Sequence, residues 1–285
     1  MARLIVVCVA AAFVFVNAGT VSAQPAGRSD IQWQSGPLTG DLGTVAQVEV
    51  PEGFRFAGQE GAKRFLELTE NPTSGNEMGV LLPEDPEKGR WFVVFEFNSI
   101  GYVKDDEKDK LDANAILTGI REGTEASNEE RKRRGWGTMR IVGWHTAPFY
   151  DTRTNNLTWA INGATEEGGV VNYSVRLLGR SGVMNADLVL APEDVDVSLP
   201  AFHSLIEGFT FKAGSRYAEF RQGDKVAAYG LTALVAGGAG AALAKSGLLS
   251  KMWKAIVLGI AALFGAIKKF FSGGRAKEEP QPANS

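Results

Sequence analysis

Hydrophobic positions are distributed unevenly and divide the chain into three regions. Residues 4–16 form an apolar run, residues 24–224 alternate between short apolar and polar segments, and residues 226–244 form a stretch of 19 residues without a charge. A helix rises about 1.5 Å per residue, and the hydrocarbon core of a bilayer is about 30 Å thick. The last stretch is therefore expected to form a transmembrane helix.

The N-terminal apolar run has the composition of a secretory signal. Arg3 precedes this run, and a Val-Ser-Ala pattern of the kind that signal peptidase cleaves ends at Ala23. We predict a signal peptide over residues 1–23 and a mature chain that begins at Gln24. An uncleaved N-terminal anchor is the alternative, and it is less favoured because 13 apolar residues are short for a span.

The alternating region predicts one exported domain over residues 24–222. The spacing of its apolar residues changes between a period of about 3.6 and a period of two, which distinguishes helices from strands. Helices are predicted over 58–70, 112–134 and 199–208. Strands are predicted over 44–50, 91–97, 138–145, 156–162, 170–178, 183–191 and 209–211. This order favours an α+β fold with a mostly antiparallel sheet and flanking helices, in an α/β/α-sandwich-like arrangement.

Three features of this domain carry specific expectations. Residues 91–97 are almost continuously apolar, so they should form a central strand covered on both faces. Asp112 should cap the second helix through its carboxylate. The strands at 156–162 and 170–178 alternate, so each should have one apolar face. The polar residues on their other faces are Thr158, Asn162, Asn172, Ser174 and Arg176.

The region beyond residue 244 is basic and partly apolar. We expect a second membrane-embedded or interfacial helix over residues 248–271 and a disordered tail over residues 272–285. A second crossing would place the final basic residues outside, against the positive-inside tendency. An interfacial helix would keep them near anionic headgroups with a cytoplasmic C-terminus, and this alternative is favoured.

Small residues recur at four-residue spacing within the first C-terminal apolar stretch, at Ala233, Gly237 and Ala241. Such a stripe lets helix backbones approach closely, so it predicts packing on the next helix or self-association with a second copy. An ordinary content of small residues explains the pattern about as well.

Charge separates the domain from the tail. Residues 24–224 carry 21 basic and 31 acidic residues, whereas residues 225–285 carry 8 basic and 2 acidic residues. An acidic domain repels phosphates, so no nucleic-acid partner is expected. The basic tail suits the cytoplasmic face of a membrane, and we expect a bacterial cytoplasmic-membrane protein with a periplasmic domain. Cys8, the only cysteine, lies in the predicted signal, so the mature chain offers no disulfide and no thiolate site.

Two segments carry the candidate binding chemistry. Residues 101–112 are rich in acids, but Lys110 and Ile116 stand where a calcium loop needs Gly and Glu, so a solvated, self-paired loop is favoured. Residues 148–151 predict a proline-set turn beside two tryptophans, which could line a cleft, although core packing is the favoured alternative. The candidate ligand-binding residues are Tyr102, Lys104, Asp105, Asp106, Trp144, Tyr150, Asp151 and Trp159.

The other polar features favour no catalytic residue, metal or cofactor. His145 and His203 lie far apart and outside any zinc motif. The charged run at residues 129–134 could grip phosphates, but a solvated helix end already explains it. A membrane-anchored hydrolase that uses Asp or Glu chemistry remains the alternative. Its candidate residues are Tyr102, Lys104, Asp105, Asp106, Tyr150 and Asp151.

Long segments of the domain resemble one bacterial family. They are WFVVFEFNSIGYVKDDE, IVGW, PFYDTRTNNLTWA, VNYSVRLLGRSGV and YAEFRQGDKVAAYGL. They resemble the uncharacterised membrane-anchored proteins with domain of unknown function 2167, over nearly the whole mature chain. The resemblance implies a membrane topology and assigns no catalytic residue. The order of elements is also similar to that of Mog1/PsbP-like sandwiches, which mostly serve as binding or assembly modules.

The sequence therefore predicts a non-enzymatic envelope protein. Its partners would be the lipid bilayer and, through the acidic exported domain, an envelope protein or a small ligand.

Overall fold

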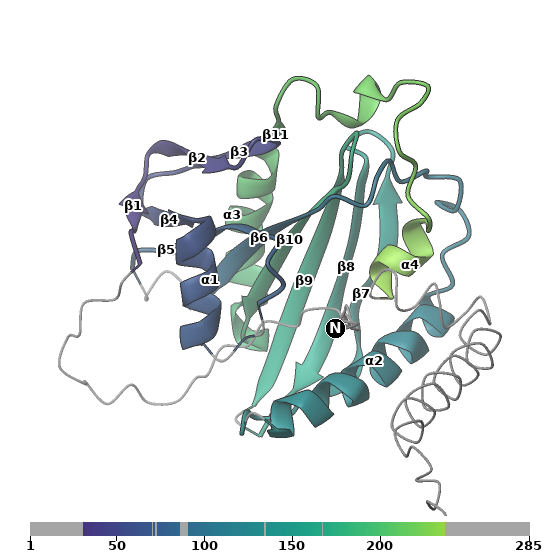
Figure 1. Cartoon of the computed structure of the whole chain (residues 1–285). Coiled ribbons are helices and arrows are strands. Elements are labelled where there is room, and N and C mark those ends of the chain that lie inside the picture. Colours follow the sequence, from purple (N-terminus) through teal and green to yellow (C-terminus); the bar gives the residue numbers. More distant parts are fainter. Residues whose placement is uncertain are drawn as a thin grey trace, which may run out of the picture. The chain divides into compact units, whose positions relative to one another are not determined.

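The strands form one large and one small sheet, both antiparallel (Figure 1). The computed structural model describes residues 31–69, 71, 73–85, 91–133, 135–166 and 168–236. The large sheet has the order β1-β4-β5-β6-β10-β9-β8-β7, and the small sheet has the order β11-β3-β2. The prediction of an α+β fold with a mostly antiparallel sheet is confirmed.

The large sheet consists of β1 (Gln34–Ser35), β4 (Phe54–Gly58), β5 (Glu77–Pro83), β6 (Phe92–Asn98), β10 (Val183–Leu190), β9 (Gly169–Leu178), β8 (Asn156–Ala164) and β7 (Arg140–Asp151). The small sheet consists of β2 (Leu38–Leu42), β3 (Ala46–Val50) and β11 (Phe209–Phe211). The helices are α1 (Gln59–Leu68), α2 (Ala113–Arg133), α3 (Val195–Glu207) and α4 (Leu231–Val235), with short 3₁₀ turns η2 (Pro192–Asp194) and η3 (Tyr217–Glu219).

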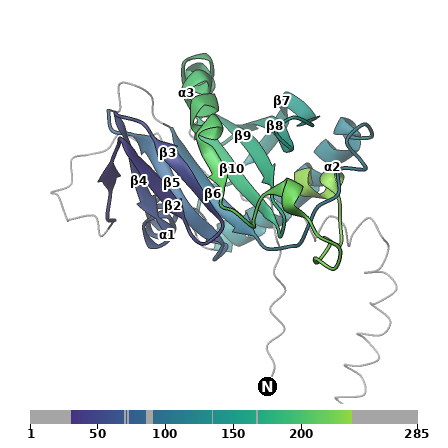
Figure 2. The same ribbon diagram turned by 90° about the horizontal axis from the view of Figure 1, so that it is seen from above.

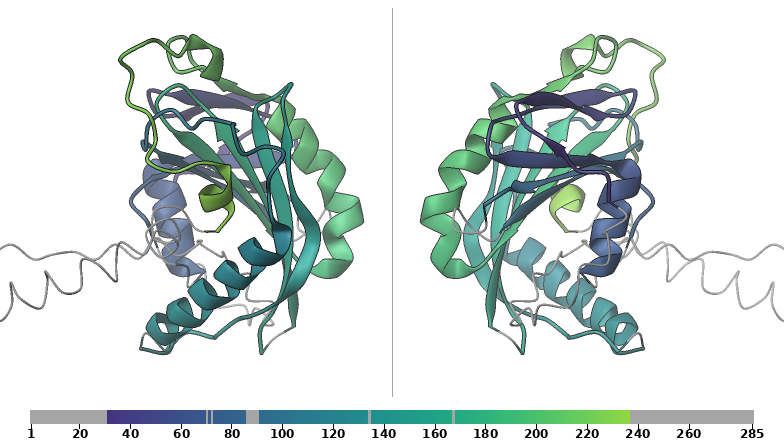
Figure 3. Two further views of the ribbon diagram at one scale, coloured as in Figure 1. Left: turned by 90° about the vertical axis from the view of Figure 1, so that its right-hand side faces the viewer. Right: turned by 90° about the vertical axis from the view of Figure 1, so that its left-hand side faces the viewer.

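Helices cover both faces of the large sheet. Figures 1 and 2 show α1, α2 and α4 over one face, which we call the front face, and α3 over the opposite back face. The side views of Figure 3 show the small sheet across one end of the domain. The small sheet packs into the same apolar cluster as α3, through Val48 and Phe202. Each fully buried side chain of this size stabilises the fold by about 1.5–3 kcal/mol.

β6 occupies the position that its apolar run predicts. It lies between β5 and β10, and its residues from Phe92 to Phe97 are buried. Alternate residues enter different cores: Val94 belongs to the front cluster and Phe95 to the back cluster. The expectation of a central strand covered on both faces is confirmed. Glu96 is the one charged residue within it.

The second helix also begins where the sequence indicates. The Asp112 carboxylate accepts hydrogen bonds from the backbone N–H groups of Asn114 (3.1 Å) and Ala115 (3.0 Å). This satisfies two of the free donors at the start of α2. Ile116 and Ile120 are buried on its inner side, so α2 packs against the front face.

The segment at residues 148–151 is a strand, and our expectation of a turn there is wrong. β7 runs on to Asp151, with register shifts between Ile141 and Gly143, Trp144 and Thr146, and Thr146 and Phe149. Pro148 lies within the last shift. Because β7 is an edge strand, the missing proline N–H costs no ladder bond.

The apolar stretch at 226–244 begins inside the domain. Val226 forms an isolated bridge with Tyr102, and the helix begins at Leu231 rather than at residue 226. Leu231, Leu234 and Val235 are buried in the front cluster. Across the residues that the structure describes, no helix has the length and apolar character needed to cross a membrane.

Several sequence-based predictions lie outside the described residues. They are the signal peptide (1–23), the remainder of the proposed span from Gly237, including Ala241, the second apolar helix (248–271) and the tail (272–285).

Candidate functional site

The segment that follows β11 is fixed to the rest of the domain at several points. We call residues 212–236 the C-terminal strap. The Arg180 guanidinium donates two hydrogen bonds to the Asp224 carboxylate, at 2.7 and 2.8 Å. These bonds lower the pKa of Asp224 to about 2. The Tyr102 backbone donates to the carbonyl of Lys225 and accepts from the N–H of Ala227, both at 2.8 Å.

The strap approaches the acidic loop at residues 101–112 so closely that the loop needs a glycine at position 101. A Cβ on Gly101, whose φ is +102°, would lie 2.7 Å from the carbonyl oxygen of Lys225. A Cβ on Gly230 would lie 2.8 Å from the Glu107 carboxyl carbon. A side chain at position 101 would meet the strap backbone and separate the loop from it, whereas one at position 230 would displace the flexible Glu107 carboxylate.

Three aromatic side chains gather where the loop meets the strap. The Tyr102 ring stacks on Tyr217 with centroids 4.5 Å apart and contacts Phe220 at 4.2 Å. The Tyr217 hydroxyl donates a 2.9 Å hydrogen bond to the carbonyl of Val103. Burial is the largest cause that raises the pKa of Tyr217. This aromatic cluster thus holds the loop and the strap together.

Tyr150 on β7 lies beside this cluster. Burial raises its pKa, and the negative charge of Asp105 and the neighbouring Tyr102 raise it further. The Tyr150 hydroxyl donates to Asn155 at 3.3 Å. The structure therefore brings together three of the predicted binding residues: Tyr102, Asp105 and Tyr150.

The other predicted binding residues do not join them. Lys104 and Asp106 are exposed on the loop, and Asp151 pairs with Arg153 at 3.2 Å in the β7–β8 turn. Trp144 donates its indole N–H to the carbonyl of Ala113. Trp159 is buried in the front core. Both tryptophans thus contribute to the packing of the core, which is the alternative interpretation given for them above.

The charged end of α2 is largely self-paired. Lys132 contacts Glu129 at 2.9 Å and Arg133 contacts Glu130 at 2.5 Å, each three residues apart on exposed turns. Arg131 is instead buried. Among the described residues, no group of three or more His, Cys, Asp or Glu side chains is arranged to hold a metal ion.

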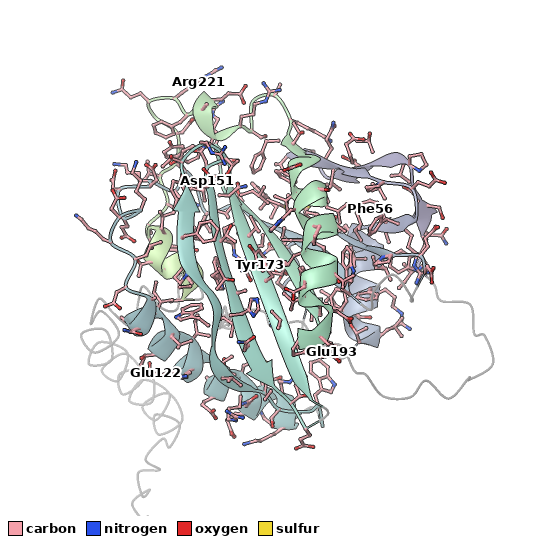
Figure 4. The ribbon with its side chains drawn as sticks, turned by 180° about the vertical axis from the view of Figure 1, so that it is seen from behind. Phe56, Glu122, Asp151, Tyr173, Glu193 and Arg221 are labelled. Carbon is pink, nitrogen blue, oxygen red and sulfur yellow. The ribbon has the colours of Figure 1, made fainter. Side chains whose placement is uncertain are left out.

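A second constellation, on the front face of the sheet, was not predicted. In the back view of Figure 4, Tyr173 lies beside α3, and its ring packs edge-on against Phe202 at 5.5 Å. Side chains alternate along a strand, so Asn172, Ser174 and Arg176 of β9 point to the front face. The same face receives Asp187 of β10, which is the register partner of Ser174.

These residues form what we call the buried polar cluster. The Asp187 carboxylate accepts hydrogen bonds from the Ser174 hydroxyl at 2.5 Å and from Arg176 at 2.9 Å. The Arg176 guanidinium lies 4.6 Å from the Trp159 ring centroid. A cation over an indole face adds roughly 0.5–2 kcal/mol. The full cluster comprises Ser74, Glu77, Glu96, Asn172, Ser174, Arg176 and Asp187.

Glu96 and Glu77 bring two more carboxylates to this cluster. They are register partners on β6 and β5. The Ser74 hydroxyl donates to Glu96 at 2.6 Å, and the Ser74 and Gly75 backbone N–H groups donate to Glu77. Burial raises the pKa of Glu96; the nearby negative charges of Asp187 and Glu77 raise it further, and the Ser74 bond opposes them.

The sequence held a weak signal for the cluster. The alternation at 170–178 predicts one apolar and one polar face and does not indicate what covers the polar one. Both faces of β9 are buried: Tyr173 and Val175 enter the back core, and Asn172, Ser174 and Arg176 enter the front core. A charged residue inside the otherwise apolar β6 was the other available indication.

A shallow depression lies elsewhere, between the small sheet and β4, with a volume of about 360 Å³. It is lined by Gln34, Thr39, Asp41, Gly43, Phe56, Gly58, Gln59 and Met78. None of the predicted binding residues lines it.

The domain is thus an α+β unit built on a large and a small antiparallel sheet, with a buried polar cluster in its front core. The chain belongs to a family of proteins of unknown function, DUF2167, whose sequence pattern matches residues 34–268. The family resemblance seen in the sequence is confirmed. Among curated proteins, none matches the chain.

Two solved structures are similar to the chain. One is the solution structure of cyanobacterial PsbP (CyanoP) from Synechocystis sp. PCC 6803, with 12% identity, 67% of this chain and 98% of that chain covered, and a TM-score of 0.36. The other is a protein of unknown function, PA94, from Pseudomonas aeruginosa, with 11% identity, 56% and 88% covered, and a TM-score of 0.24. Neither TM-score supports an argument about function.

Proposed function

We propose that this protein is a membrane-anchored binding module of the bacterial envelope, with its α+β domain outside the cytoplasmic membrane. The supporting observation is the docked C-terminal strap. Leu231, Leu234 and Val235 belong to the apolar stretch that leads to the tail, and they are buried in the front core. The first part of this apolar stretch, up to Val235, is therefore an element of the domain core.

Docking of α4 bears on which apolar stretch would enter the membrane. If residues up to 236 stay with the domain, residues 237–244 offer about 12 Å of helix against about 30 Å of hydrocarbon. A span over 226–244 would require α4 to leave the core. With α4 docked, membrane attachment would depend on residues 248–271. We propose that these residues then cross the membrane, which gives the cytoplasmic C-terminus that the basic tail favours.

Catalysis by the loop and turn residues considered for a hydrolase is disfavoured because two of them have structural partners. Tyr102 stacks on Tyr217, and Asp151 pairs with Arg153. One observation favours a hydrolase as the second candidate function. Glu96, whose pKa is raised by burial, lies near the Asp187 carboxylate, and such a pair can divide acid and base roles.

Localisation and topology are tested on the full chain in its native membrane. Intact mass should show a mature N-terminus at Gln24, and the protein should resist extraction with alkaline carbonate. A reporter fused after Ser285 should be active in its cytoplasm-dependent form and silent in its export-dependent form. Retention of residues 1–23, or a carbonate-soluble protein, would contradict the proposed anchoring.

The binding function is tested by crosslinking and pull-down of the intact protein from membranes. The same preparation carrying Tyr102→Ala serves as a comparison, because that change removes the aromatic contact between loop and strap. A specific envelope protein or small molecule recovered with the wild type supports a binding module. Hydrolytic turnover that Glu96→Gln abolishes would favour the hydrolase instead.

A further inference from the structure

One side of the β2 backbone points away from the rest of the small sheet. The backbone N–H of Glu49 in β3 is bonded to the residue just before β11. Neighbouring residues of a strand direct their backbone groups to opposite sides, so Val48 bonds to its register partner Gly40 in β2. By the same alternation, the N–H and C=O groups of Thr39 and Asp41 point away from β3. Among the described residues, β2 is the last strand of the small sheet, so these groups form a free edge.

The other edge strands are poorer templates for a further strand. β1 has two residues and β11 has three. β7 contains Pro148 and three register shifts. Short length, proline and bulges are features by which proteins protect sheet edges from additional pairing. β2, in contrast, pairs with β3 over five consecutive residues without a shift, and its sequence has no proline. Among the described strands, β2 is therefore the edge best suited to accept another strand.

The depression between the small sheet and β4 lies at this free edge. Its lining includes Asp41 of β2, Phe56 of β4 and Met78 of β5. Gly58 also lines it, and a Cβ added there would meet no atom within 4 Å. A Cβ on Gly40 would point at the Phe56 ring, 3.2 Å away. Register partners in a sheet direct their side chains to the same face, so a residue added beside Gly40 would also point towards Phe56 and enter the depression.

The polar lining of the depression favours a positively charged side chain. Asp41 is the one charged residue among the described lining residues, and the amide oxygens of Gln34 and Gln59 can accept N–H donors. Asp41 pairs with Lys212 at 2.6 Å, but its side chain is still 74% exposed, so it can receive a second cation. Residues 24–224 as a whole carry 31 acidic and 21 basic residues. Charge complementarity therefore favours a basic partner.

We propose that the free edge of β2 binds an extended, basic peptide segment of a partner protein, which adds a strand to the small sheet and places a lysine or arginine side chain in the depression. Backbone hydrogen bonds to Thr39 and Asp41 would supply affinity, and the depression would supply specificity. The aliphatic stem of the bound side chain would cover Met78, and its charged end would lie among Asp41 and the two glutamine amides. This inference rests on the proposed binding function and names the chemistry of the partner.

The test begins with peptide selection on the full-length protein in detergent. The probe is a phage-displayed library of random dodecapeptides, depleted beforehand on the support without protein. Enriched peptides should contain a lysine or arginine within a proline-free run that is rich in β-branched residues, as an added strand requires. A library that shows no enrichment, or enriched peptides that are acidic or proline-rich, would overturn the proposal.

Fluorescence anisotropy with the labelled, enriched peptides then locates the site. Gly58→Leu fills the depression at a position whose φ of −72° suits any residue, and it should weaken binding by about tenfold or more. Gly123→Leu, a matched change at an exposed glycine of α2 with equally open space, should leave binding unchanged. If Gly58→Leu fails to fold, Thr39→Pro provides the same test, because it removes an N–H of the free edge that the sheet does not use. Wild-type affinity of every enriched peptide for the folded variants would refute the assignment.

The outcome is separable from the fate of the proposed function. Capture of the same envelope protein in equal yield by the wild type and by Thr39→Pro would overturn this inference and leave the binding module standing. A protein that binds basic peptides at β2 but is released from membranes by carbonate would support this inference and contradict the proposed anchoring.

Discussion

Glu107 and Thr232 lie 125 residues apart, and the Glu107 carboxylate accepts a 2.9 Å hydrogen bond from the Thr232 backbone N–H. Glu107 belongs to the acidic loop, and Thr232 belongs to the apolar stretch that hydropathy assigns to the membrane. The bond satisfies one of the free donors at the start of α4. The loop that we considered as a calcium site thus has a structural role at the strap.

Glu107→Ala should therefore loosen α4. The mature chain is free of cysteine if the signal is cleaved, so a single Val235→Cys reports on docking through its rate of maleimide labelling. Val235 is buried, and we expect slow labelling that becomes several-fold faster when Glu107→Ala is added. Loss of a hydrogen bond to a charged group costs about 1.5–3 kcal/mol where it is buried, and less at this partly exposed carboxylate.

Ala228→Cys, at an exposed position of the strap, is the matched control and should label quickly in both backgrounds. If Val235→Cys labels as fast as Ala228→Cys in the otherwise unaltered protein, α4 is not docked in solution.

Glu96→Gln should stabilise the protein at neutral and alkaline pH. The folded-state pKa of Glu96 is raised above 4.5, so the folded state holds this proton more tightly than the unfolded state does. Its contribution to stability is fully present below pH 4.5 and is lost as pH rises through the folded-state pKa. Gln cannot ionise, so the variant avoids this loss.

Urea denaturation between pH 4 and 8 measures the effect. The free energy of unfolding of Glu96→Gln minus that of the wild type should grow with pH, by at most about 1.4 kcal/mol per pH unit. A difference that stays constant over this range would show that Glu96 keeps its usual pKa in the folded protein.

Tyr217→Phe isolates one hydrogen bond of the aromatic cluster. The variant keeps the ring that stacks on Tyr102 but loses the bond to the Val103 carbonyl, so we expect a loss of about 1 kcal/mol. Tyr217→Ala also loses the ring and should cost about 3 kcal/mol. Urea midpoints of both variants provide the comparison. Equal losses would mean that the stacking contributes nothing.

Asp224→Asn should remove a source of acid sensitivity. Its hydrogen bonds with Arg180 lower the pKa of Asp224 to about 2, below the usual 3.8. The stabilisation is present above pH 3.8 and is lost as pH falls through about 2. The wild type should therefore exceed the variant in urea midpoint at pH 6, and the two should converge near pH 2. Parallel midpoints over this range would contradict the assignment.

Local patterns predicted much of the fold. The apolar run of β6, the carboxylate at Asp112 and the alternation of β8 and β9 each depend on a few neighbouring residues, and each produced the expected element. Pro148 misled us because a proline signals a turn in most contexts, whereas an edge strand with register shifts tolerates it. The short β2 gave no periodic signal of its own.

The candidate sites were harder to predict because they depend on long-range pairing. The loop residues Tyr102 and Asp105 were recognised, but their aromatic partners Tyr217 and Phe220 come from a segment more than 110 residues later. The polar cluster depends on which face of β9 meets which core. Alternation of apolar and polar residues along a strand predicts two different faces, but it does not indicate whether both faces are buried.

Burial of α4 in the front core also determines how a mechanical load would enter the domain. Tension on the chain beyond Ala236 acts first on Leu234 and Val235, and then along the strap to the Arg180–Asp224 pair near its middle. The central strands are stressed only after these contacts yield. Force from the tail would therefore peel away α4 and the strap from the acidic loop and expose the edge of the front core, while the sheet that carries Asp187 stays intact.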